Sequence, residues 1–227
     1  MAFPYDQTPA QNLIDGQLTP NDITHDGLLN AVREVPREQF VPEAFAHTAY
    51  VDEEIPLGDG RVLIEPLLQV KLLQALDAQP HESILIIGGA SGYSAALLSR
   101  FCARVEMVEE HPALAHMAME AMKQMQISNV TVAQHKLVHG APGAGPYDAV
   151  LIEGAVQQIP EAISAQLKEG GRLLVCHNKH LRPGSRTGLA QAKYYEKRDG
   201  KLSARVLFDT SVSLLPGFEI APSFIFN

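Results

Sequence analysis

Short hydrophobic runs alternate with stretches of helical spacing through the middle of the chain. The run Ile84–Ile87 is unbroken and rich in β-branched residues, which is typical of a strand buried on both faces. Further strands are predicted at residues 105–108, 129–133, 147–152 and 172–176, and helices at 93–101, 112–126 and 159–167. Because strands and helices alternate, the pattern predicts right-handed crossovers and a parallel sheet.

The end of the chain breaks this alternation. Two strand-like runs, residues 190–197 and 202–208, flank Asp199-Gly200, which is a strong signal for a tight hairpin. A parallel unit that finishes in an antiparallel hairpin distinguishes Rossmann-like methyltransferases from dinucleotide dehydrogenases, whose sheets stay parallel. The expected fold is therefore α/β, of the Rossmann-like class I methyltransferase type, with a mostly parallel seven-stranded sheet.

The first eighty residues have a different texture. Leu28, Leu29, Val32 and Val35 lie at helical spacing, with Asp26 upstream as a candidate N-cap and a proline at position 36 to end the helix. Residues 36–66 are rich in proline, glycine and acids, so irregular structure is expected, and residues 69–76 predict another helix. We expect residues 1–80 to form a helical and loop extension packed on a core of residues 81–227.

Composition limits the partners of this 227-residue chain. Its formal net charge of −8 argues against nucleic acid and against an anionic membrane surface, because both favour basic proteins. The N-terminus lacks the pattern of a signal peptide, and no apolar stretch reaches the roughly 20 residues that span a bilayer. Cys102 and Cys176 are expected to be buried thiols in a reducing cytoplasm, with a disulfide or a catalytic thiol as the alternatives. No metal-binding motif is present.

A glycine-rich turn follows the first strand of the parallel unit. It comprises Gly88, Gly89, Ala90, Ser91 and Gly92, directly before a predicted helix. Glycines allow the backbone to approach a ligand, and the helix start offers unpaired N–H groups. Ligands of such sheets bind at the carboxyl ends of the strands, so this turn is a candidate cofactor site. The alternative is a tight turn that binds nothing.

The second predicted strand ends in Glu109-Glu110. Glu109 lies roughly 20 residues past the glycine turn, where an acid receives the two hydroxyl groups of a ribose. Together with the terminal hairpin, this position favours S-adenosylmethionine over NAD as the cofactor. The alternative is a solvated acid pair that caps the helix beginning at Pro112.

Several segments resemble the protein-L-isoaspartate O-methyltransferase family. Residues 28–42 resemble the segment of the family that carries its VPRExFVP signature, and residues 92–98 resemble its GYQAALLA helix. Residues 146–149 and 170–173 resemble later sequence motifs of the family. The resemblance runs from about Asn12 to Val175, and residues 214–218 fit a bacterial branch of the family. It implies methyl transfer from S-adenosylmethionine to the α-carboxylate of L-isoaspartyl residues in damaged proteins or peptides. The ester then collapses to a succinimide that can reopen to normal aspartate.

The chain departs from the family pattern around the cofactor. The acid expected in the first strand is Ile86, and the middle glycine of the turn is Ala90, which would be strained by a positive φ. The segment that holds the adenine amine in the family aligns with residues 135–137, so Lys136 and Leu137 are the candidate residues there. If the site is lost, Ile86 and Ala90 are expected to fill the adenine slot between Glu109 and Leu137.

The acceptor side departs as well. The family's threonine and serine, which lie near the transferred methyl, align with Val62 and Ile64. Carboxylates stand nearby, Glu65 after the aligned serine and Glu153 at the end of the fourth strand. Ile64, Glu65 and Glu153 are thus the candidate residues around the acceptor, although both acids also suit ordinary ion pairing or exposure.

Three hypotheses follow for the function. The first is the family reaction on isoaspartyl peptides. The second keeps the fold and cofactor but methylates an amine or hydroxyl, with Glu153 or Glu65 as the base. The third is a non-catalytic homologue that serves as a protein- or peptide-binding module. The sequence leaves the oligomeric state open.

Overall fold

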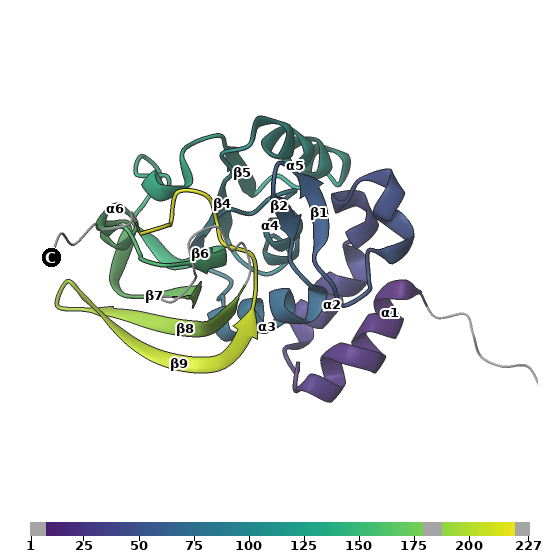
Figure 1. The fold of residues 1–227 in the computed structure, drawn as a ribbon, viewed down its shortest axis with the longest axis horizontal. Helices are drawn as coiled ribbons and strands as arrows, with labels where there is room; N and C mark the ends of the chain where they lie inside the picture. Colours follow the sequence, from purple (N-terminus) through teal and green to yellow (C-terminus); the bar gives the residue numbers. More distant parts are fainter. Residues whose placement is uncertain (1–7, 179–187, 221–227) are drawn as a thin grey trace, which may run out of the picture.

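A seven-stranded sheet forms the centre of the protein (Figure 1). The computed structural model describes residues 8–178 and 188–220. The strand order is β5-β4-β3-β6-β7-β8-β9, and β3 to β7 are mutually parallel. The strands are β3 (Ser83–Ile87), β4 (Arg104–Val108), β5 (Val130–Ala133), β6 (Tyr147–Val156), β7 (Leu167–His177), β8 (Leu189–Arg198) and β9 (Lys201–Ser211). The predicted mostly parallel sheet is confirmed.

The last two strands form the predicted antiparallel hairpin at one edge of the sheet (Figure 1). Its turn is Asp199-Gly200, with φ angles of 51° and 74°. Two consecutive positive φ values are characteristic of the tight turns whose twist matches that of paired strands, and aspartate followed by glycine tolerates them best. The hairpin prediction is therefore confirmed for a physical reason that was visible in the sequence.

Helices cover the sheet and build the N-terminal part. The α-helices are α1 (Pro9–Leu13), α2 (Asp26–Glu34), α3 (Pro66–Leu76), α4 (Tyr93–Leu98), α5 (Pro112–Gln124) and α6 (Glu161–Ala165). Shorter turns are η1 (Ile14–Leu18), η2 (Thr19–Asn21), η3 (Arg37–Phe40), η4 (Glu43–Thr48) and η5 (Leu137–His139). In the two described ranges, none of the helices has the length and apolar character that crossing a bilayer requires.

The start of α2 differs from the prediction. The N-cap is His25, whose Nδ1 accepts a hydrogen bond from the Leu28 N–H at 3.0 Å, and Asp26 is the first helical residue. The prediction was wrong by one position because histidine is an uncommon cap, whereas aspartate is a preferred one. Asp26 still stabilises the helix, since a negative charge in the first turn opposes the helix dipole.

A small hairpin interrupts the segment that was expected to be irregular. Strands β1 (Ile55–Gly58) and β2 (Arg61–Leu63) pair antiparallel around a turn of Asp59 and Gly60. Both turn residues have positive φ, 47° and 74°. Arg61 is the first residue of β2, directly after this turn, and it is buried. The proposed division of the chain at residues 80 and 81 stays a prediction.

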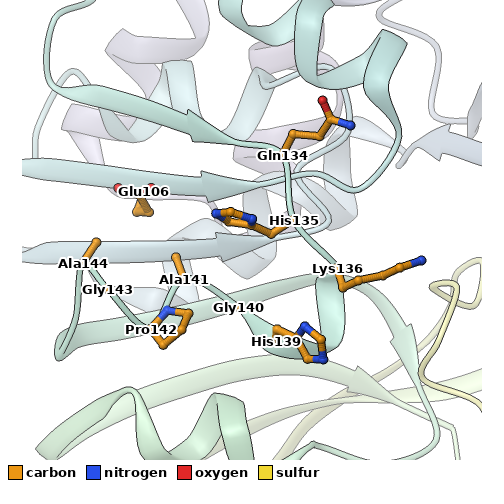
Figure 2. Close-up of a pocket in the computed structure, with 10 residues that line it drawn as sticks. All are labelled: Glu106, Gln134, His135, Lys136, His139, Gly140, Ala141, Pro142, Gly143 and Ala144. Atoms are coloured by element: carbon orange, nitrogen blue, oxygen red, sulfur yellow. The ribbon is translucent and has the colours of Figure 1, made fainter.

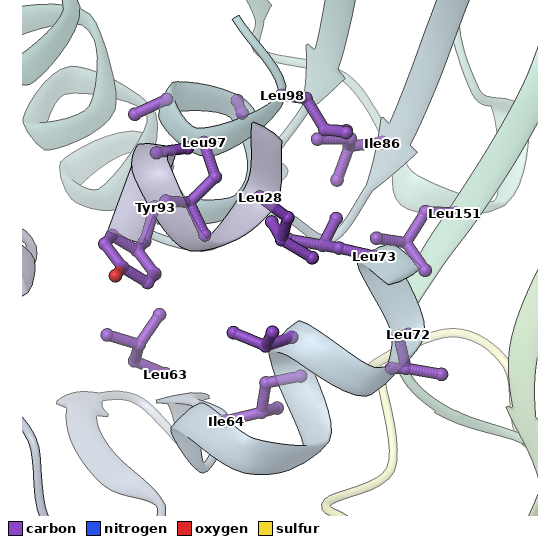
Figure 3. Packing of buried hydrophobic residues seen from close by; sticks show 14 of the residues in the cluster. Leu28, Leu63, Ile64, Leu72, Leu73, Ile86, Tyr93, Leu97, Leu98 and Leu151 are labelled. Carbon is purple, nitrogen blue, oxygen red and sulfur yellow. The ribbon is translucent and has the colours of Figure 1, made fainter. Parts of the chain in front are cut away.

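Two hydrophobic clusters lie on opposite faces of the sheet. One contains alternate residues of β3 such as Ile84 and Ile86, together with the inner faces of α2, α3, α4 and α5. Figure 3 shows Ile86 in this cluster near Leu73, Leu98 and Leu151. The other contains Leu85 and Ile87, together with Ile163 of α6 and the C-terminal residues Leu215 and Phe218. Burial on both faces explains why β3 reads as an unbroken apolar run.

Candidate functional site

The glycine turn follows β3, which lies between β4 and β6 in the sheet. After β3 the chain adds β4 and β5 on one side of it, and then β6 and β7 on the other side. Such a switch point is the usual ligand site of an open α/β sheet. Gly88 and Gly92 have φ angles of 74° and 98°, and Ala90 has 52°. The three residues therefore hold the left-handed backbone that the turn requires. An alanine pays about 1–2 kcal/mol for this conformation, so Ala90 is the strained position of the turn.

Glu109 follows β4 and is fully buried beside the turn. Its Oε2 accepts a hydrogen bond from the Ala90 N–H at 2.9 Å, and its Oε1 accepts one from the His111 N–H at 3.0 Å. The carboxylate is thus fixed by two backbone donors, and the alternative of a solvated acid is wrong for Glu109. Glu110 is half-buried and forms an ion pair with Lys136.

Arg61 reaches into the same place from the β1–β2 hairpin. Its Nη2 donates to Glu109 Oε2 at 2.7 Å and to the Gly88 carbonyl oxygen at 3.0 Å. Both side chains are almost entirely buried, with 7% and 0% of their surfaces exposed. The sequence analysis missed this ion pair because 48 residues separate its members. In this ion pair the Arg61 guanidinium occupies the carboxylate of Glu109, which was expected to bind the ribose hydroxyls.

Leu215 covers the turn from the other side. A Cβ at Gly88 would lie 2.9 Å from Leu215 Cδ2, and one at Gly154 would lie 2.6 Å from Leu215 Cγ. Hydrogen bonds of 2.9 Å join the Leu215 N–H to the Ala155 carbonyl and the Ala155 N–H to the Ser213 carbonyl. The C-terminal segment is thereby fastened along the end of β6 and brings an apolar side chain to the switch point.

A cavity of about 290 Å³ remains next to this closed region. Glu109 and Leu137, between which the adenine slot was expected, both line this cavity, and Arg61 lines it as well. Ile86 is absent from this lining because its side chain points into the core. Neither Ile86 nor Ala90 lines this cavity, so the filling that was expected for a lost site is not what the structure shows. Arg61 and Leu215 are the side chains that approach Gly88.

Lys136 does not enter the slot. Its side chain is 67% exposed and pairs with Glu110 at the surface. A second cavity of about 590 Å³ lies nearby, and Figure 2 shows the side chain of Lys136 extending away from it. In the same view the ring of His135 extends toward the buried Glu106. Burial raises the pKa of Glu106, and its electrostatic interactions with Arg104 and His135 partly oppose this. Leu137, in contrast, is buried and contributes to the slot.

The candidate residues on the acceptor side lie in different environments. The side chain of Ile64 is buried in the core (Figure 3), so it offers only its carbonyl oxygen to other groups. Glu65 is half-buried at the N-cap of α3. Burial and the negative charges of Asp52 and Glu54 raise its pKa. Glu153 is 4% exposed and lies near the carboxyl end of β6.

A buried polar network holds Glu153. The Gln69 side-chain amide donates to Glu153 Oε1 and, at 2.8 Å, to Ser94 Oγ. Arg37 donates in turn to Gln69 Oε1. Glu153 Oε2 is buried and has no hydrogen-bond partner within the described residues. One acceptor atom at the end of β6 is therefore available to a ligand or to water.

The protonation state of Glu153 follows from its burial. Desolvation raises its pKa to about 7, although hydrogen bonds from Ser94 and Gln69 and the charges of Arg37 and Arg61 act in the opposite direction. A carboxyl group with this pKa is largely neutral in mildly acidic solution and changes charge near neutrality. Burial likewise raises the pKa values of Cys102 and Cys176 to about 12, so neither thiol is activated as a nucleophile. The described ranges contain no group of three potential metal-ligating side chains.

Comparison with known proteins gives a consistent picture. The sequence profile described as protein-L-isoaspartate(D-aspartate) O-methyltransferase matches residues 8–211. A protein-L-isoaspartate O-methyltransferase of Aliivibrio salmonicida is 35% identical over 163 residues, 72% of this chain and 78% of its own. Protein-L-isoaspartate O-methyltransferase 1 of Syntrophobacter fumaroxidans is 36% identical over 169 residues, 74% and 79% of the two chains.

Solved structures agree with the fold. One protein-L-isoaspartate O-methyltransferase superposes with a TM-score of 0.78 at 26% identity, covering 92% of this chain and 66% of its own. A second structure, from Plasmodium falciparum and in complex with S-adenosyl-L-homocysteine, gives a TM-score of 0.74 at 17% identity, covering 92% and 99%. The second likeness concerns the fold alone. The fold class expected from the sequence is confirmed.

Proposed function

The chain belongs to the protein-L-isoaspartate O-methyltransferase family, and from this premise we propose that it methylates the α-carboxylate of L-isoaspartyl residues with S-adenosylmethionine. The observation that carries the proposal is the position of Glu109. It stands at the end of β4, buried beside a left-handed turn and fixed by two backbone N–H groups. This is the arrangement that a ribose requires of its acid.

The donor and acceptor groups of the site fit the polar parts of the cofactor. Glu109 is the acceptor for the ribose hydroxyls, the Gly88 carbonyl is an acceptor for an ammonium group, and Leu137 offers an apolar wall for the adenine. Arg61 at present satisfies both Glu109 and Gly88. The residues therefore fit S-adenosylmethionine once Arg61 withdraws from them.

The chemistry asks little of the protein beyond placement. S-adenosylmethionine, when bound, supplies an electrophilic methyl group on a positively charged sulfur. A carboxylate is already a nucleophile, so the site needs to orient it and to exclude water rather than to remove a proton. Glu153 would repel an incoming carboxylate if it were ionised, but burial raises its pKa to about 7 and favours the neutral form. Below about pH 7 the neutral form predominates, and there Glu153 does not repel an anionic acceptor.

A second candidate function deserves a test because of Arg61 and Leu215. Their closure over Gly88 suits a homologue that keeps the fold and binds proteins or peptides without the cofactor. Under this alternative, the Arg61–Glu109 ion pair is a permanent part of the core. The two candidates differ in whether Glu109 can exchange its partner.

Calorimetric titration of S-adenosylhomocysteine separates them. We expect saturable binding to the wild-type protein, weakened roughly tenfold or more in Glu109→Ala, because charge-assisted hydrogen bonds contribute about 1.5–3 kcal/mol. Glu120→Ala removes a partly exposed acid on α5 and serves as the control for the change in net charge. Absence of binding to every form would reject the enzymatic proposal and leave the binding module.

A further inference from the structure

Arg61 lines the candidate site and forms its ion pair with Glu109, yet the methyl transfer proposed above does not use its positive charge. It follows the two-residue turn of the β1–β2 hairpin and extends to the ends of two strands, β3 at Gly88 and β4 at Glu109. Its charge also lowers the pKa of Glu153, so it acts on the end of β6 as well. The guanidinium is therefore hydrogen-bonded to the candidate acid of the ribose site and acts electrostatically on the candidate acid of the acceptor side.

The contacts of Glu109 make Arg61 a competitor of the cofactor. Oε2 of Glu109 already receives the Ala90 N–H and the Arg61 guanidinium, and Oε1 receives the His111 N–H. A ribose hydroxyl needs the same oxygen atoms. Within the described part of the chain, the donors to Glu109 are two backbone N–H groups of the same segment and the Arg61 side chain of a separate hairpin, so the bonds of Arg61 are the contacts that binding can replace.

A buried guanidinium that loses its carboxylate requires another anion, because an unpaired buried charge is costly. Arg61 Nε is already buried without a hydrogen-bond partner in residues 8–178 and 188–220, so the group has donors to offer. Glu153 could pair with Arg61 only in its ionised form, which burial disfavours. Arg37 directs its own donors to Ala49, Ile64 and Gln69 and does not compete for an entering anion.

We propose that Arg61 is the specificity-determining residue that binds the acceptor carboxylate, and that it becomes available for this task when the cofactor takes Glu109 from it. This inference rests on the proposed function. In the cofactor-free protein Arg61 pairs with Glu109; in the loaded protein it pairs with the carboxylate that receives the methyl group. The exchange imposes an order, with the cofactor first and the acceptor second. It also supplies a positive charge that the aligned Val62 and Ile64 side chains lack.

The test uses full-length Arg61→Gln and Arg61→Lys, with Arg100→Gln as the control at a partly exposed arginine outside the site. In calorimetry, S-adenosylhomocysteine should bind Arg61→Gln about tenfold more tightly than the wild type, because the competing side chain no longer reduces the binding-competent fraction. In steady-state methylation of an isoaspartyl peptide, the KM for the peptide should rise roughly tenfold or more, since a charge-assisted hydrogen bond is lost. Arg61→Lys should restore part of the KM, and thermal unfolding monitors the fold of each variant.

Each outcome decides a separate point. Tighter S-adenosylhomocysteine binding with an unchanged peptide KM would overturn the carboxylate-binding role and leave the proposed function intact. Unchanged or weaker S-adenosylhomocysteine binding in a folded Arg61→Gln would overturn the competition. If neither the wild type nor Arg61→Gln binds S-adenosylhomocysteine, the proposed function fails and this inference fails with it.

Discussion

Arg37→Ala is expected to lower the free energy of unfolding by about 3–5 kcal/mol, the largest loss among the substitutions considered, because it removes a fully buried charge on which several partners depend. Arg37 Nε donates to the Ala49 carbonyl at 2.7 Å, and Nη2 donates to the Ile64 carbonyl at 2.5 Å. The guanidinium also lies over the Tyr93 ring, 4.8 Å from its centroid. An alanine would leave a cavity and buried acceptors without their donor.

Urea unfolding of the variant and of the wild type measures this loss. Arg33→Ala is the matched control, because Arg33 is an exposed arginine near the end of α2 whose guanidinium donates to the side chains of Gln11 and Asn30. Its substitution should change stability by about 0.5 kcal/mol or less. A similar, small effect for both substitutions would show that the buried network does not stabilise the fold in the way proposed.

Glu153→Gln is expected to remove a pH dependence of stability of about 3 kcal/mol, since each pKa unit corresponds to about 1.4 kcal/mol. The pKa of Glu153 rises from an ordinary value of 4.5 to about 7 in the folded protein. Below pH 4.5 the group is protonated in both states and costs nothing. As the pH rises toward 7, the unfolded chain ionises first, so stability falls through this window.

The measurement is the difference in unfolding free energy between the wild type and Glu153→Gln at pH 4.5 and at pH 7.5. Other titrating groups cancel in this difference, which should favour the glutamine variant at the higher pH. Glu43→Gln, at an exposed glutamate of η4, should show no such trend. A constant difference across the range would contradict the raised pKa of Glu153.

The sheet could be predicted because each of its strands carries a local signal. Burial on both faces gives the unbroken run of β3, and the aspartate-glycine pair at 199–200 gives the terminal hairpin. Glu109 could be located for a similar reason, since the spacing from turn to acid is a property of one βαβ unit. Features that a single segment determines could therefore be predicted from the sequence.

Contacts between segments that are distant in the sequence could not be predicted. Arg61 meets Glu109 across 48 residues, and Gln69 meets Glu153 across 84 residues. Their pairing depends on where the β1–β2 hairpin and α3 pack, which no local pattern encodes. Ile86 illustrates the same limit. It replaces the acid that the family pattern has at the end of the first strand, but only the packing shows that its side chain points into the core.

Transfer of a labelled methyl group tests the central claim most directly. Two peptides of identical sequence, one with an L-isoaspartyl linkage and one with a normal aspartyl linkage, are incubated with labelled S-adenosylmethionine, and the base-labile methyl ester is counted. The account predicts ester on the isoaspartyl peptide alone, and its loss in Glu109→Ala. Absence of ester on the isoaspartyl peptide, or equal labelling of both peptides, would contradict it.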